Sequence, residues 1–84
     1  MKIGMTLPVM EPGLTRQDLE NWTKEIDNGP WSHIALGERI LFSNPEFIST
    51  LSAVAAWTKR VEIIATISVL TMHDPILSAK QFAT

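Results

Sequence analysis

The sequence predicts an α/β fold in which three parallel strands alternate with three helices. Three apolar segments, at residues 2–8, 31–37 and 61–68, have the length and composition of strands. Each of them is followed by a segment in which apolar residues recur at helical spacing. Because the connections are short, we expect the strands to lie side by side in chain order, joined by right-handed crossovers.

The first strand is expected to end at Pro8, because proline is tolerated at a strand end but not within a central ladder. Thr15 and Asp18 then have the spacing of a capping box, which begins a helix. Gly29 and Pro30 are expected to end that helix. Its apolar stripe is predicted to consist of Leu19, Trp22 and Ile26.

The second strand alternates, with Ile34 and Leu36 on one face. The next helix is predicted to begin at residues 44–45 and to end at residues 59–60, whose positive charges suit a helix C-terminus. Its residues at helical spacing are Phe47, Leu51, Val54, Ala55 and Thr58.

The third strand, residues 61–68, is a nearly continuous β-branched run, which is typical of a parallel strand covered on both faces. Asp74 followed by Pro75 is a strong start for the third helix. That helix reaches the last residue without a capping signal. We therefore expect residues 1–84 to be a single incomplete domain, the amino-terminal part of a larger α/β domain.

The composition excludes several classes of protein. With 84 residues, of which 45% are hydrophobic and 19% charged, the chain is long enough for one globular domain only. The net charge of −2 and the lack of a basic run argue against nucleic-acid or anionic-membrane partners. There is no cysteine and no signal or transmembrane segment, so a cytoplasmic location is expected.

Polar residues follow the second and third strands at their carboxyl ends, where parallel sheets place their ligands. Glu38 and Arg39 are either ligand-contacting groups or an ion pair on a solvated loop. Thr66 and Ser68 point to the same side of the third strand, and their hydroxyl groups either meet a ligand or fill the interior of a barrel.

The two histidines are weaker candidates. His33 lies within the second strand and is expected to be structural. His73 and Asp74 have the side chains of a metal site or a catalytic dyad, but the capping role of Asp74 is favoured. A metal-dependent hydrolase that uses His33, Glu38 and His73 remains an alternative. No glycine-rich loop follows the first strand, which argues against a dinucleotide-binding domain.

Several segments, spread over the whole chain, carry a family resemblance. They are IGMTLPV, LGERI, NPEF, LSAVAAWTKRVEI and VLTMHDPILSAKQFAT. They resemble the luciferase-like flavin- or deazaflavin-dependent oxidoreductases, also called luciferase-like monooxygenases. The last segment is the most specific, because it is similar to the family pattern VLPMHxPxxxAKQxATLD, although Thr71 stands where proline is common. The resemblance implies a TIM-type barrel, of which this chain holds the first three β/α units.

The resemblance also implies a cofactor site for FMN or a deazaflavin coenzyme across the carboxyl ends of the strands. It implies that Pro8 and Val9 approach the cofactor ring. It places a bulge with a non-prolyl cis peptide behind the ring, within Thr66, Ile67, Ser68 and Val69. Many relatives have an acid followed by histidine after the second strand; here Glu38 matches the acid and Arg39 replaces the histidine. Glu38 and Arg39 are therefore the catalytic candidates.

The activity implied is hydride transfer, or oxygen activation by reduced FMN, on a small organic molecule. The family draws most of its cofactor tail contacts from later strands, so residues 1–84 alone are expected to lack a complete site. The partner that completes the sheet is expected to be the rest of the barrel or a second copy of the chain. The alternative is a non-catalytic half-barrel module that assembles with another chain through its open edge.

Overall fold

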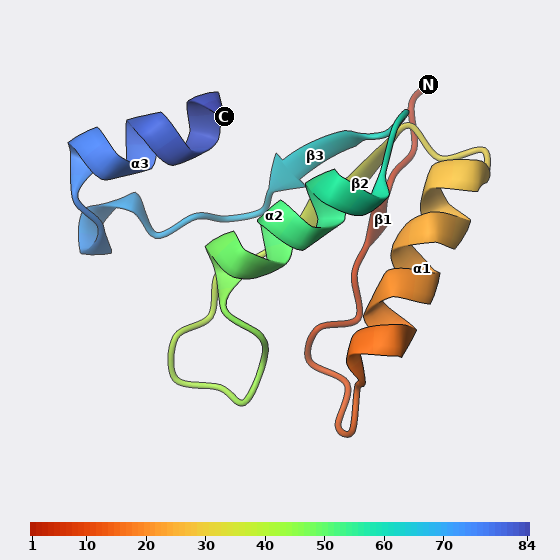
Figure 1. The fold of residues 1–84 in the computed structure, drawn as a ribbon, viewed down its shortest axis with the longest axis horizontal. Coiled ribbons are helices and arrows are strands. Elements are labelled where there is room, and N and C mark those ends of the chain that lie inside the picture. The colour runs from red at the N-terminus through yellow and green to blue at the C-terminus, as the bar shows by residue number, and fades with distance from the viewer.

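The computed structural model describes residues 1–84 and contains one three-stranded sheet with strand order β1-β2-β3 (Figure 1). Along the chain the elements are β1 (Met5–Thr6), α1 (Arg16–Asn28), β2 (His33–Leu36), α2 (Phe47–Trp57), β3 (Glu62–Ala65), a 3₁₀ helix (Leu70–Met72) and α3 (Pro75–Ala83). Both strand pairs are parallel. The predicted α/β class, the parallel direction and the strand order are therefore confirmed.

The strands are shorter than predicted, but their register continues past their ends. Met5 lies opposite Ile34, and Ile34 lies opposite Ile63. Beyond the end of β1, the Leu7 amide donates a hydrogen bond to the Ala35 carbonyl at 3.0 Å, so the pairing with β2 continues. Because the three strands are in register, the segments that follow them meet at one edge of the sheet.

The core lies between helices α1 and α2 and the face of the sheet that carries Ile34 and Leu36. Its nine buried apolar residues are Leu7, Val9, Leu19, Ile26, Ile34, Leu36, Phe47, Val54 and Val61. Helix α3 lies apart from α1, beyond the carboxyl end of β3 (Figure 1). None of the helices combines the length and the apolar character that crossing a bilayer demands.

Helix α1 begins as predicted, but its buried stripe differs from the expected one. Thr15 and Asp18 form the capping box, with the Asp18 amide 3.1 Å from the Thr15 hydroxyl. Leu19 and Ile26 are buried, whereas Trp22 is 44% exposed. The buried residue between them is Thr23, whose hydroxyl donates to the Leu19 carbonyl. Trp22 lies about 60° from Leu19 around the helix, at the margin of the stripe.

Helix α2 differs from the prediction at both ends. It does not begin at residues 44–45, because Glu46 is the N-cap and its carboxylate accepts from the amides of Ile48 at 3.0 Å and Ser49 at 2.8 Å. It ends at Trp57, so residues 59–60 lie beyond it rather than in its last turn. The glutamate side chain reaches two of the first-turn amides that have no partner within the helix, so the helix begins two residues later than Asn44 and Pro45 suggest.

The predicted role of residues 59–60 is replaced by a bridge between the end of α1 and the start of β3. The Asp27 carboxylate accepts from the amides of Lys59, Arg60 and Val61, each at 3.0 Å. The Arg60 guanidinium donates in return to the carbonyl oxygens of Asp27 and Gly29, each at 2.9 Å. Arg60 therefore caps the C-terminus of α1 and not that of α2, the helix directly before it in the chain.

The Asp27 bridge makes stability depend on pH. Hydrogen bonds from the Val61 and Lys59 amides hold the pKa of Asp27 below its usual range. Because the folded pKa is below the unfolded one, ionised Asp27 stabilises the protein above the unfolded pKa, and this contribution is lost as pH falls through the folded pKa. We expect Asp27→Asn to lower Tm at neutral pH and to flatten its fall in acid.

Melting curves followed by circular dichroism between about pH 7 and pH 2 would measure this effect. Glu62→Gln is the control, since Glu62 is exposed. Parallel curves of Tm against pH for Asp27→Asn and the wild type would contradict the prediction.

The start of α3 agrees with its sequence signal, whereas the environment of β3 does not. Asp74 is the N-cap of α3, and its carboxylate accepts from the Leu77 amide at 2.8 Å. The expectation that β3 is covered on both faces is wrong, because Glu62 and Ile63, whose side chains point to opposite faces, are both exposed. A β-branched run reports strand propensity and hydrophobicity, but not how many neighbours the strand has.

Candidate functional site

The candidate site lies where the segments after β1, β2 and β3 meet. The Thr66 amide donates to the Leu36 carbonyl at 2.8 Å, and the Glu38 amide donates to the Ile67 carbonyl at 2.9 Å. These two bonds hold the segment after β3 against the end of β2. The peptide between Thr66 and Ile67 is cis, as the family resemblance implied for this segment.

A cavity of about 280 Å³ opens at this edge of the sheet. Its lining residues are Thr6, Leu7, Pro8, Val9, Met10, Glu11, Gly37, Arg39 and Thr66. Four predicted site residues, Pro8, Val9, Arg39 and Thr66, are thus brought together from three separate segments. The other predicted residues, Glu38, Ile67, Ser68 and Val69, are not part of its lining.

Gly37 allows the close approach of the two segments below the cavity. A Cβ atom at position 37 would lie 2.6 Å from the Thr66 carbonyl oxygen, which is closer than real Cβ contacts. Only glycine therefore fits between β2 and the backbone at Thr66. This close contact explains why the LGERI segment has a glycine at position 37.

The Glu38 carboxylate is enclosed by polar groups from the segment after β3. Its side chain is only 4% exposed. One oxygen accepts from the Val69 amide at 2.6 Å and lies 3.5 Å from the Ser68 hydroxyl. The other oxygen lies 2.5 Å from Nε2 of His73. Glu38 is therefore committed to protein partners, in contrast to its neighbour Arg39.

Arg39 is exposed and is one of the residues that line the cavity. Its guanidinium carbon lies 6.0 Å from the centre of the Phe42 ring, which is within the range of a weak cation–π contact. Arg39 thus adds a positively charged residue to a lining that also contains Pro8 and Val9.

The sequence gives His73 only as a weak candidate for a metal site or a catalytic dyad, and it does not predict the contact that His73 makes with Glu38. Asp74 was correctly read as the cap of α3, but the adjacent His73 side chain contacts Glu38, which lies 35 positions earlier in the chain. Burial raises the pKa of the Glu46 carboxyl, but the hydrogen bonds from Ser49 and Ile48, with a smaller contribution from the nearby His73, hold that pKa below its usual value. The only sequence signal was the gathering of polar residues between β3 and α3.

The alternative metal site is not assembled. His33 lies at the start of β2, where its ring contacts the backbone of Gly4 and its Nδ1 lies 2.9 Å from the Ser32 hydroxyl. Glu38 and His73 are together at the opposite end of the sheet. No group of three potential metal-ligating side chains occurs in the chain. The reading of a metal-dependent hydrolase built on these three residues is therefore wrong.

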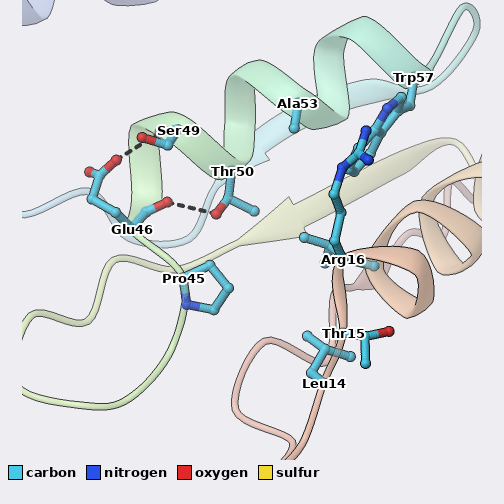
Figure 2. Close-up of a pocket in the computed structure, with 10 residues that line it drawn as sticks. Leu14, Thr15, Arg16, Pro45, Glu46, Ser49, Thr50, Ala53 and Trp57 are labelled. Carbon is cyan, nitrogen blue, oxygen red and sulfur yellow. Dashed lines mark hydrogen bonds between the residues drawn. The ribbon is translucent and has the colours of Figure 1, made fainter.

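A second cavity, of about 500 Å³, lies between α1 and α2 and contains none of the predicted site residues (Figure 2). Figure 2 shows that its polar groups serve helix α2: Glu46 binds Ser49, and the Thr50 hydroxyl donates to the Glu46 carbonyl. The Arg16 guanidinium lies 5.9 Å from the Trp57 ring centre. Because these groups already have partners, we assign this cavity to helix packing.

Comparison with known families matches residues 1–84 to the luciferase-like monooxygenases. No curated protein and no solved structure gave a match. The matched range includes all three segments that form the cavity at the carboxyl ends of the strands, and also the Glu38–His73 pair.

Proposed function

This chain belongs to the luciferase-like monooxygenase family, and we propose that it supplies the first three β/α units of a TIM-type barrel that uses a flavin or deazaflavin. The proposal is supported by one observation above all: Pro8, Val9, Arg39 and Thr66 line a single cavity. The cavity lies at the carboxyl ends of parallel strands, the edge at which barrels and open α/β sheets bind ligands. The unpaired edge of β3 is where the next strand of a barrel would add.

The lining of the cavity fits one side of a flat, partly apolar ring. Pro8 and Val9 offer aliphatic surface, Gly37 has no side chain to obstruct access, and Arg39 adds a positive charge at the rim. When bound, a flavin or deazaflavin supplies hydride transfer, and a reduced flavin can also activate oxygen. The two charged residues in the lining are Glu11 and Arg39, and both are exposed. The protein residues therefore orient and shield the reacting groups rather than attack the substrate.

In this proposal each segment has its own task. Pro8 and Val9 exclude water from one side of the ring, and residues 66–69 form the segment behind it, of which Thr66 lines the cavity. The Arg39 guanidinium attracts and orients an anionic or polarised part of the ligand. Glu38 acts on the shape of residues 66–69 rather than on the substrate, because its carboxylate is bound to protein groups and does not line the cavity.

Arginine substitutions in the two cavities test this assignment. Arg39→Ala is expected to weaken binding of FMN or the deazaflavin coenzyme about tenfold, because a charge-assisted contact is lost. Arg16→Ala is the matched control, since Arg16 lines the cavity between α1 and α2. Fluorescence titration of each purified variant with each cofactor measures the dissociation constants.

The cofactor that binds more tightly would identify the chemistry. Because residues 1–84 are proposed to be only part of the barrel, these titrations use a complete barrel that contains them, and failure of its wild-type form to bind either cofactor would refute the proposal. A loss of affinity in Arg16→Ala but not in Arg39→Ala would move the site to the other cavity.

A further inference from the structure

We propose that His73 is a positioning residue that, through Glu38, fixes the backbone of residues 66–69, the segment whose first residue, Thr66, lines the cavity. The inference rests on the proposed function, because it treats that segment as the wall of a cofactor site. It concerns a residue from the loop before α3 that lies outside the cavity lining. His73 would act on the ligand only through Glu38 and the backbone that Glu38 holds.

The first support is the way in which Glu38 ties two segments together. Its main-chain amide donates to the Ile67 carbonyl at 2.9 Å, and its carboxylate accepts from the Val69 amide at 2.6 Å. Glu38 thus hydrogen-bonds to the segment after β3 on both sides of Ser68, at Ile67 and at Val69. Any rotation of the Glu38 side chain would release the Val69 amide and loosen the wall.

The second support is the contact that prevents this rotation. The Glu38 oxygen that does not bind Val69 lies 2.5 Å from Nε2 of His73. With a side chain only 4% exposed, Glu38 cannot exchange that partner freely for water. The imidazole Nε2–H group therefore fixes the second oxygen, and with it the plane of the carboxylate.

The third support is that His73 has no comparable role in its own helix. Asp74 caps α3 through its contact with the Leu77 amide. The imidazole is 32% exposed, so one edge meets Glu38 while the rest of the ring remains accessible. The His73 side chain is thus directed to the end of β2 and not to the start of α3.

Two substitutions of similar size separate positioning from simple packing. The amide of glutamine can place a donor near the position of Nε2, whereas the shorter asparagine places its donor near the position of Nδ1. We expect His73→Asn to weaken cofactor binding about tenfold and to speed exchange of the Val69 amide about tenfold. His73→Gln is expected to restore both to within about threefold of the wild type.

Amide exchange by NMR in cofactor-free protein and fluorescence titration with FMN or the deazaflavin coenzyme give the two readouts. His33→Gln, at the other end of β2, should change neither. Equal behaviour of His73→Gln and His73→Asn, or unchanged Val69 exchange in both, would overturn the assignment. If a complete barrel that contains residues 1–84 binds neither cofactor, the proposed function fails, and Val69 exchange alone decides whether His73 holds Glu38.

Discussion

Gly37→Ala is expected to destabilise the folded protein by about 2–3 kcal/mol and to disrupt the cavity at the carboxyl ends of the strands. The added Cβ atom would lie 2.6 Å from the Thr66 carbonyl oxygen. This oxygen belongs to the main chain, which two hydrogen bonds hold in place. The Thr66 amide donates to the Leu36 carbonyl, and the Glu38 amide donates to the Ile67 carbonyl. Relief of the clash therefore requires that one of these hydrogen bonds lengthen or break.

Gly13→Ala is a suitable control for this substitution. Gly13 has a positive φ of 77°, but an added Cβ atom there would meet nothing within 4 Å. We expect it to cost about 1 kcal/mol through backbone strain alone and to leave cofactor binding unchanged. Urea unfolding and fluorescence titration measure the two effects, and equal losses of stability and binding in both variants would argue against a steric role for Gly37.

Local signals predicted the parts of the fold that depend on neighbouring residues. The capping box at Thr15 and the N-cap at Asp74 are contacts over three positions, and the structure has both. The strand order followed from short crossovers in the same way. The errors arose where a glutamate caps a helix two residues after the predicted start, as Glu46 does, or where a residue lies at the edge of a helical stripe, as does Trp22.

Contacts between distant segments could not be read from the sequence. The bridge from Arg60 to the end of α1 spans about thirty positions, and the pair of Glu38 and His73 spans 35. No periodicity or spacing rule links such residues, since their meeting depends on strand register and loop path. The family resemblance supplied four of the nine residues that line the cavity. The contacts that hold residues 66–69 are visible only in three dimensions.

The site therefore has two layers with different sequence signatures. Pro8, Val9, Arg39 and Thr66 form the surface that a ligand would meet. Behind them, Glu38 connects the end of β2 to the segment after β3. An acidic residue next to an exposed arginine looks like an ion pair in sequence, but here the two side chains serve different layers.

Removal of the Glu38 carboxylate is expected to lower stability at least as much as Gly37→Ala does. Glu38→Ala leaves the Val69 amide and the His73 imidazole without their partner in a region where the carboxylate was 4% exposed. Each unsatisfied buried group costs about 1–3 kcal/mol, so we expect a total loss of about 2–4 kcal/mol after water has reached the partly exposed imidazole. Cofactor binding should fall with it, because the wall at residues 66–69 loses its anchor.

Glu62→Ala is the matched control for Glu38→Ala, because Glu62 is an exposed glutamate on the adjacent strand β3. It is expected to change the free energy of unfolding by no more than about 0.5 kcal/mol. Glu38→Gln should fall between the two, since its amide oxygen can still accept from Val69. Denaturant unfolding of the three variants gives the free energies. A loss in Glu38→Ala no greater than in Glu62→Ala would mean that the contacts with Val69 and His73 do not stabilise the site, because water would then replace the carboxylate without cost.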